Sequence, residues 1–454
     1  MPTWLKILIV ILVLVILTAA GYFVWKNYFR QKPTQPATQE KLELDPAKVA
    51  THLSKVAETE NAYWMRGGFD LFWNEVEPEK SEFDWTFTDE RVKELNQQEV
   101  YLIPIVKPFA NWDQDACHPE EKYEADYDPM KGGKVKVGAP CDMTAYADFL
   151  EKAIERYDGD GQDDMPGLTI PIKYWEIMNE PEMQGGSTGG VGEELKFFVG
   201  TSQEYFEILK TSYQTIKKAD PEAKVLPAGM AGMQQSFQDF WKPVFAAGAG
   251  DYFDIANIHT INTDEKREDL YVIKFKKFLE QYGLQNKPIF VTELQYGELT
   301  EPPTDLAAFE RLMVKSSVFG LAMGADKLFY IDNWMFWQEG GFSVTQKPNP
   351  QALQGSTHKV YLNLVDKINS FDKIEKIDEK YVENPADNDG ATCNIGQYKF
   401  ISGSKSIYVL WGGEVPSEIK GKIKVTDIYG DSEQIQAEDL TLIDQPVFVE
   451  LISE

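Results

Sequence analysis

Two glutamates each close a short apolar stretch of the sequence, Glu180 in KYWEIMNEPE and Glu293 in KPIFVTELQYG. A carboxylate in such a place needs a partner or a shifted pKa, because apolar burial disfavours its ionised form. Two carboxyl groups at one site can cleave a glycosidic bond with retention of configuration. One protonates the leaving oxygen, and the other attacks the anomeric carbon from roughly 5–5.5 Å away. The two residues therefore indicate glycoside hydrolysis, provided that the fold brings them together.

The elements that must position these glutamates alternate along the chain. From about residue 46 to 375, short β-branched or aromatic runs are followed by longer stretches with helical periodicity, a pattern typical of a parallel sheet. Seven such strands approach an eight-stranded barrel, whose active site lies at the C-terminal ends of its strands. We therefore expect an α/β fold, a (β/α)8 TIM barrel with both glutamates at its mouth. The predicted strands are 63–71, 100–106, 172–178, 224–228, 253–259, 288–293 and 327–332.

Helical stretches separate these strands. In residues 144–157 the apolar side chains recur at intervals of three and four, which places them on one face of a helix. The first strand of the barrel is indistinct, because residues 46–58 have a helical pattern. The other predicted helices are 203–219, 264–282, 305–323 and 356–371.

The chain divides into four segments. Residues 1–30 read as a membrane anchor or signal segment, and 31–45 as a polar linker that contains two prolines. Residues 46–375 form the predicted barrel. From 376 to 454, short alternating runs separated by Gly, Asp and Pro predict a small C-terminal β-sandwich.

The N-terminal segment carries no charge from residue 7 to 25, close to the roughly 20 residues that a helix needs to cross a bilayer. A signal peptide would be cut after Thr18-Ala19-Ala20, whereas an uncleaved anchor would place Tyr22 and Trp25 at the membrane interface. We favour a single N-terminal transmembrane helix, with secretion after cleavage as the alternative. The flanking charges leave the orientation open, so the extracytoplasmic placement of the catalytic domain rests on its predicted chemistry.

The ends of the predicted strands resemble a known superfamily. Asn179-Glu180-Pro181 after one strand, with a strand-end glutamate at Glu293, resembles the retaining glycoside hydrolases of clan A, most like family 39 or family 5 relatives. Their fold is a (β/α)8 barrel. The resemblance implies Glu180 as acid/base and Glu293 as nucleophile, and it implies that Asn179 holds the sugar 2-hydroxyl. A barrel that kept these residues without activity is the alternative interpretation.

Three further positions agree with this resemblance. Arg66, in MRGGFDLFWNEVEPEKSEFDW, matches the second-strand arginine, which implies a place beside the nucleophile that keeps it ionised. His259, in DIANIHTIN, matches the sixth-strand histidine, and Trp334, in FYIDNWMFW, the tryptophan that forms the floor of the sugar site. The alternative roles are a structural ion pair for Arg66, a core histidine, and core packing for Trp334.

One departure concerns the nucleophile. Many clan members have a tyrosine two residues after the sixth-strand histidine, hydrogen-bonded to the nucleophile, whereas this chain has Ile261. Tyr296 or Tyr330 could substitute for it.

Composition limits the partners. The net charge of −28 opposes nucleic acid, which is bound mainly through clustered Lys and Arg, and favours a neutral carbohydrate substrate. The four histidines and three cysteines show no zinc-site spacing. We expect no required cofactor, and a monomer.

Two local features leave alternatives open. Asp158, Asp160 and Asp164 crowd oxygen ligands into a glycine-containing turn, which fits either a structural calcium ion or an acidic solvated loop. Cys117 and Cys141 could close a disulfide in an exported protein, or remain as two thiols.

Two rival functions share these residues. An inactive surface carbohydrate-binding barrel would bind sugar without turnover, and a displaced Glu293 or the loss of the tyrosine partner would favour it. A transglycosylase would share the first half of the hydrolase mechanism but would exclude water and bind an acceptor.

Overall fold

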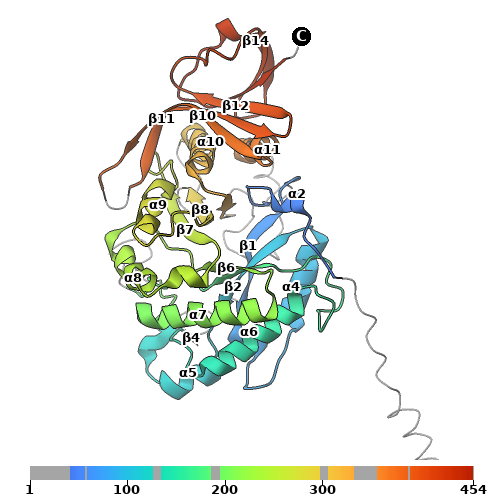
Figure 1. The fold of residues 1–454 in the computed structure, drawn as a ribbon, viewed down its shortest axis with the longest axis vertical. Helices are drawn as coiled ribbons and strands as arrows, with labels where there is room; N and C mark the ends of the chain where they lie inside the picture. The colour runs from blue at the N-terminus through green and yellow to red at the C-terminus, as the bar shows by residue number, and fades with distance from the viewer. Residues whose placement is uncertain are drawn as a thin grey trace, which may run out of the picture.

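The computed structural model describes residues 41–56, 59–125, 134–185, 195–296, 305–331, 355–386 and 389–452. Figure 1 shows a barrel with helices outside it and an antiparallel sheet that lies above α10 and α11. In the described residues no helix is long and apolar enough to cross a membrane. The predicted anchor, residues 7–25, lies outside the described residues and stays a prediction.

The barrel is a closed ring of parallel strands. Strands β1-β2-β5-β6 form one sheet and β7-β8-β9 another, and every pair within them is parallel. A bridge between Met230 and Ile258 joins the two sheets on one side. On the other side, Leu53 bridges to Leu328 and Ser54 to Trp64. The strand bounds are β1 Trp64–Phe72, β2 Tyr101–Lys107, β5 Tyr174–Ile177, β6 Lys224–Pro227, β7 Ala256–Thr263, β8 Ile289–Tyr296 and β9 Lys327–Tyr330.

Each of the seven predicted strands is present, with ends that shift by up to four residues. The first strand differs from the prediction. Residues 46–58 do not form one helix, because α2 covers only Pro46–Val49 and the chain then runs along the barrel. Leu53 and Ser54 occupy the first strand position through single bridges. Two residues are too few to leave a strand pattern in the sequence.

The helices outside the barrel bury the apolar faces that the sequence predicts. In α6 the buried residues are Tyr146, Phe149, Leu150, Ala153, Ile154 and Tyr157. Its N-terminus is capped by the Asp142 side chain, and that of α7 by a capping box between Thr201 and Glu204. The helix bounds are α3 Trp73–Val76, α4 Thr86–Gln97, α5 Asn111–Cys117, α6 Met143–Tyr157, α7 Ser202–Ala219, α8 Gln235–Ala246, α9 Val272–Glu280, α10 Leu306–Met323 and α11 Ser356–Ile368.

The predicted helix 264–282 is shorter in the structure, since α9 begins at Val272. The preceding residues bind the C-terminal sheet instead. The Glu268 carboxylate accepts the Cys393 N–H at 2.6 Å, and that of Asp269 accepts the Ala391 N–H at 2.7 Å. These tertiary contacts outweigh the helical propensity of the segment.

The C-terminal region is one continuous antiparallel sheet with strand order β10-β11-β12-β15-β13-β14, not the two stacked sheets of a simple sandwich. Alternate residues of β12 serve two cores. Val409 and Trp411 pack with the barrel helices, whereas Tyr408 and Leu410 belong to a separate core of the sheet itself. The bounds are β10 Lys373–Glu383, β11 Ala391–Ser402, β12 Lys405–Trp411, β13 Lys422–Thr426, β14 Ser432–Gln436 and β15 Val447–Leu451.

Cys117, the last residue of α5, forms a disulfide with Cys141 just before α6. The bond ties together the ends of a segment that contains the short hairpin of β3, Glu124–Ala125, and β4, Val135–Lys136. It confirms the paired alternative of the two that the sequence left open.

Candidate active site

A cluster of buried charged side chains lies inside the barrel near the C-terminal ends of its strands. Arg66 on β1 contacts Glu176 on β5, although β2 separates these strands in the sheet. Side chains of non-adjacent strands can meet in this way only if both point into the barrel. Glu180 follows β5 by three residues, and His259 on β7 and Glu293 on β8 complete the cluster.

Arg66 is the centre of this cluster. Its Nε donates to Glu176 Oε2 at 2.8 Å and one terminal nitrogen to Glu176 Oε1 at 2.7 Å, which is a bidentate pair. The same nitrogen donates to Asn179 Oδ1 at 2.6 Å. The other terminal nitrogen donates to Glu293 Oε1. One guanidinium therefore fixes two carboxylates and an amide.

His259 joins the two predicted catalytic glutamates. Its Nδ1 lies 2.7 Å from Glu180 Oε1 and 3.8 Å from Glu293 Oε2. Its Nε2 lies 3.0 Å from Thr292 Oγ1, whose hydroxyl donates to Asn257 Oδ1 at 2.7 Å. With both ring nitrogens in contact with protein atoms, His259 is better placed to hold the glutamates than to bind substrate.

The backbone near Glu180 is strained. Met178 has a φ of 69° and Glu180 a φ of 39°, a region that residues with a Cβ rarely adopt. Met183 N–H donates to the Glu180 carbonyl at 2.9 Å and helps to hold this turn. Across the site, a Cβ on Gly229 would lie 1.8 Å from His259 Nε2, so only glycine leaves room for the imidazole. These features orient Glu180 and His259 toward each other at a conformational cost.

The two glutamates have opposite electrostatic environments. Burial raises the pKa of Glu180, and the negative charge of Glu293 adds to this, although His259 acts against both. Burial alone would raise the pKa of Glu293 too, but His259 and Arg66 outweigh it and hold the pKa below its usual range. One oxygen of each carboxyl group lies within 4.8 Å of the other. The opposite shifts favour a protonated acid at Glu180 and an ionised carboxylate at Glu293.

The structure brings Arg66, Asn179, Glu180, His259 and Glu293 together. Trp334 lies outside the described residues, so its predicted place stays a prediction. The suggested replacements for the missing tyrosine are wrong. The Tyr296 hydroxyl contacts Ser316 and that of Tyr330 contacts Ser317, both serines of α10. Among the described residues, Arg66 and His259 lie against Glu293 instead.

Several residues of the site were not singled out from the sequence. Glu176 is fully buried, and its signal was a charge inside the apolar run YWEI. Thr292 and Asn257 have no distinctive signal. Glu182 accepts the Ala231 N–H at 2.6 Å, and burial raises the pKa of Glu182 to about 8. At the mouth, Lys107 lies 3.7 Å from Asp70.

Three groups of described residues have the ligand types of a metal site, and in one of them Cys117 and Cys141 are already joined by the disulfide beside His118. Glu180, His259 and Glu293 offer atoms within 4.8 Å of one another, but the Arg66 cation on Glu293 opposes a bound metal ion. Asp158, Asp160 and Asp164 are equally close together. There, the Gly159 N–H donates to Asp164 Oδ1 and the Gly161 N–H to Asp164 Oδ2, each at 2.9 Å. A calcium ion at this turn stays a prediction.

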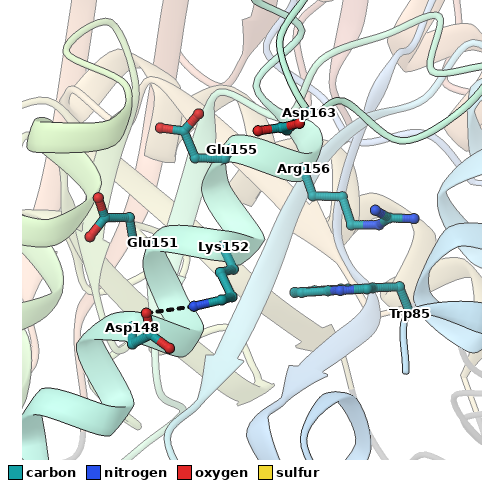
Figure 2. Close-up of a pocket in the computed structure, with 7 residues that line it drawn as sticks. All are labelled: Trp85, Asp148, Glu151, Lys152, Glu155, Arg156 and Asp163. Atoms are coloured by element: carbon teal, nitrogen blue, oxygen red, sulfur yellow. Dashed lines mark ion pairs between the residues drawn. The ribbon is translucent and has the colours of Figure 1, made fainter. Parts of the chain in front are cut away.

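A separate hollow of about 430 Å3 lies on the outer helical layer, between α6 and Trp85 (Figure 2). Lys152 pairs with Asp148 at 2.5 Å within α6. The guanidinium of Arg156 lies over the Trp85 ring at 5.4 Å. Neither Glu180 nor Glu293 lines this hollow, so it is not the site of the predicted chemistry.

No protein-family model matches the chain, and no curated protein matches it. Its fold, however, is shared with solved structures. A family 39 glycoside hydrolase from Bacteroides cellulosilyticus WH2 has a TM-score of 0.55 at 14% identity, over 86% of this chain and 76% of that one. A glucosidase from Croceicoccus marinus has a TM-score of 0.52 at 9% identity, over 92% and 97%. An α-L-arabinofuranosidase from Thermotoga maritima has a TM-score of 0.52 at 13% identity, over 93% and 98%.

These likenesses show that the chain has the fold of glycoside hydrolases. The predicted resemblance to clan A, with family 39 among the similar structures, is confirmed at the level of the fold.

Proposed function

We propose that this protein hydrolyses O-glycosidic bonds with retention of configuration, through Glu180 as acid/base and Glu293 as nucleophile. The observation that carries the proposal is the short distance between the two carboxyl groups, within 4.8 Å for one oxygen of each. A retaining site needs carboxyl groups about 5–5.5 Å apart, whereas an inverting site leaves roughly 6.5–9.5 Å for a water molecule.

In the first step Glu293 attacks the anomeric carbon while Glu180 gives its proton to the leaving oxygen. The raised pKa of Glu180 and the lowered pKa of Glu293 suit these two tasks. Glu293 keeps 15% of its side-chain surface exposed. Asn179, held by Arg66, is proposed to bind the sugar 2-hydroxyl.

In the second step water hydrolyses the glycosyl-enzyme. The ester on Glu293 no longer carries a charge, so the pKa of Glu180 falls and its carboxylate can take a proton from the water. No step in this sequence uses a metal ion or cofactor.

The substrate is proposed to be a neutral, β-linked oligosaccharide or polysaccharide. The net charge of −28 disfavours an anionic polymer. Two of the similar structures are named a glucosidase and an α-L-arabinofuranosidase, both for neutral sugars.

The catalytic domain is proposed to work outside the cytoplasm, attached by the N-terminal segment or secreted after its cleavage. The Cys117–Cys141 disulfide supports this placement, because disulfides persist in oxidising compartments.

Turnover of aryl β-glycosides tests the function. We expect the purified protein to hydrolyse at least one of the xyloside, glucoside, galactoside and mannoside, and Glu293→Ala to abolish that hydrolysis. Sugar binding without turnover in the wild type would support the binding-protein alternative. Products longer than the substrate would support the transglycosylase.

A further inference from the structure

The protonation of His259 can be read from its neighbours. His259 is fully buried on β7, and both of its ring nitrogens lie close to oxygen atoms. A neutral imidazole has one N–H and one lone pair, whereas an imidazolium has two N–H donors. The two nitrogens therefore have to be considered separately.

The Nε2 side is decided by a chain of hydrogen bonds. The Asn257 amide nitrogen donates to the Pro227 carbonyl at 3.2 Å, which turns the amide oxygen toward Thr292. The Thr292 hydroxyl donates its only hydrogen to this oxygen at 2.7 Å. Its own oxygen can then only accept from His259 Nε2 at 3.0 Å. Nε2 therefore carries a hydrogen.

The Nδ1 side is decided by charge. Nδ1 lies between two carboxyl groups, 2.7 Å from Glu180 Oε1 and 3.8 Å from Glu293 Oε2. The other charged groups that face the ring are Glu176, 3.9 Å from Nε2, and Arg66 from β1. Glu176 and ionised Glu293 bring two negative charges and Arg66 one positive charge. Lys107 also acts on Glu293, but its charge is matched by Asp70 at 3.7 Å, so a neutral cluster requires a further cation. Burial lowers the pKa of His259, but Glu293 and Glu180 outweigh burial and raise it.

We propose that His259 is a permanently protonated positioning residue whose Nδ1–H stabilises Glu293 before bond cleavage and Glu180 after it. The proposal rests on the two-glutamate function above. When the bond from Glu293 to the anomeric carbon forms and the glycosidic bond breaks, the Glu180 proton moves to the leaving oxygen. The negative charge thus passes from Glu293 to Glu180.

Hydrolysis reverses this transfer. The water oxygen bonds to the anomeric carbon, a water proton moves to Glu180, and the ester bond electrons return to Glu293. The imidazolium keeps both hydrogens throughout. The buried cluster is therefore neutral before and after each step, which avoids the cost of an unpaired buried charge.

Nitrogen NMR tests the protonation without any need for turnover. The chain has four histidines, so a histidine-selective 15N label gives few signals, and His259→Asn identifies the signal of interest. At pH 7 we expect both ring nitrogens of His259 in the full-length protein to be protonated. A single protonated nitrogen would overturn the proposal, whether or not the protein hydrolyses glycosides.

The pH profile tests the role, on the aryl glycoside that the wild type hydrolyses. An imidazolium beside two carboxyl groups lowers the pKa of both. In His259→Asn we therefore expect both limbs of the profile at higher pH by about one unit or more, together with a lower maximum rate. A lower rate with both limbs at the wild-type pH would mean that His259 contributes packing and no charge to the site.

A second pair of variants covers the case in which His259→Asn does not fold. Thr292→Val removes the acceptor of the Nε2 hydrogen, and Thr292→Ser keeps it. We expect the limbs of Thr292→Val to move in the same direction by a smaller amount, and those of Thr292→Ser to match the wild type. Equal profiles for the two variants would contradict the hydrogen-bond chain.

Discussion

The two ends of the barrel bury charge in different ways. At the mouth, Arg66 lies between Glu176 and Glu293, with carboxylates as its partners. At the opposite end, the Lys327 ammonium donates to the Val49 and Thr51 carbonyls and lies 4.4 Å from the centre of the Trp64 ring. Aromatic and aliphatic side chains close this end, among them Trp64, Tyr101 and Phe290.

The same strands contribute to both ends, two or three residues apart. On β1, Trp64 packs at the closed end and Arg66 binds the catalytic glutamates. On β8, Phe290 packs at the closed end and Glu293 lies at the mouth. The closed end stabilises the barrel, while the mouth contains strained backbone and interdependent charges. This division is typical of barrel enzymes. Substitutions at the two ends should therefore separate stability from activity.

The largest effect is expected from Arg66→Met, which should reduce both stability and activity. It leaves Glu176 and Glu293 as buried negative charges without their cation. We expect the free energy of unfolding to fall by about 3–5 kcal/mol. Hydrolysis should fall as well, because the pKa of Glu293 rises. Denaturant unfolding and aryl glycoside turnover measure the two effects. Arg66→Lys keeps the charge without the bidentate geometry, so its stability and turnover should lie between those of Arg66→Met and the wild type. Unchanged stability in Arg66→Met would contradict the ion pairs of Arg66 with Glu176 and Glu293.

Glu180→Gln should reduce activity and leave stability almost unchanged. We expect hydrolysis of a glycoside with a poor leaving group to fall by about 10²–10⁴-fold, the usual contribution of a general acid. The free energy of unfolding should change little, because the amide still reaches His259. The raised pKa of Glu180 means that the wild-type rate falls as rising pH ionises the acid. This alkaline limb should be absent in Glu180→Gln, and full activity of the variant would exclude Glu180 as the acid.

Lys327→Met should affect stability alone, since it leaves the Thr51 carbonyl without its donor, at a cost of about 1–3 kcal/mol. Burial lowers the pKa of Lys327 to about 7, below its unfolded value. Between the folded and the unfolded pKa of Lys327, the unfolded chain binds more protons than the folded chain, so the free energy of unfolding rises with pH. We expect this rise in the wild type and its loss in Lys327→Met. The matched control is Lys224→Met, an exposed lysine at the same end. Reduced turnover in Lys327→Met would mean that the closed end of the barrel also affects catalysis at the mouth.

The mouth of the barrel could largely be predicted from the sequence, whereas the closed end could not. The short β-branched and aromatic runs indicate the strand positions, and both catalytic candidates follow from this pattern together with the resemblance. Strand register could not be predicted, and register places Glu176 inside the barrel rather than outside. Glu176 was therefore missed, although it lies only four residues before Glu180.

Other residues were missed because their roles depend on tertiary contacts. Thr292 and Asn257 are ordinary strand residues until β7 and β8 place them beside His259 and each other. The helix 264–282 was predicted too long because Glu268 and Asp269 bind the C-terminal sheet. Local pattern carries no information on such partners.

The smallest expected effect belongs to Tyr101→Phe at the closed end. The Tyr101 hydroxyl accepts the Asp45 N–H at 2.9 Å and so ties the chain before α2 to β2. Removing this one neutral hydrogen bond while the ring stays packed should lower the free energy of unfolding by about 0.5–1.5 kcal/mol. Turnover and its pH profile should match the wild type, because the hydroxyl lies at the end of β2 away from Lys107. A shifted profile would mean that the closed end influences the charges at the mouth, and stability and catalysis could then no longer be assigned to separate ends of the same strands.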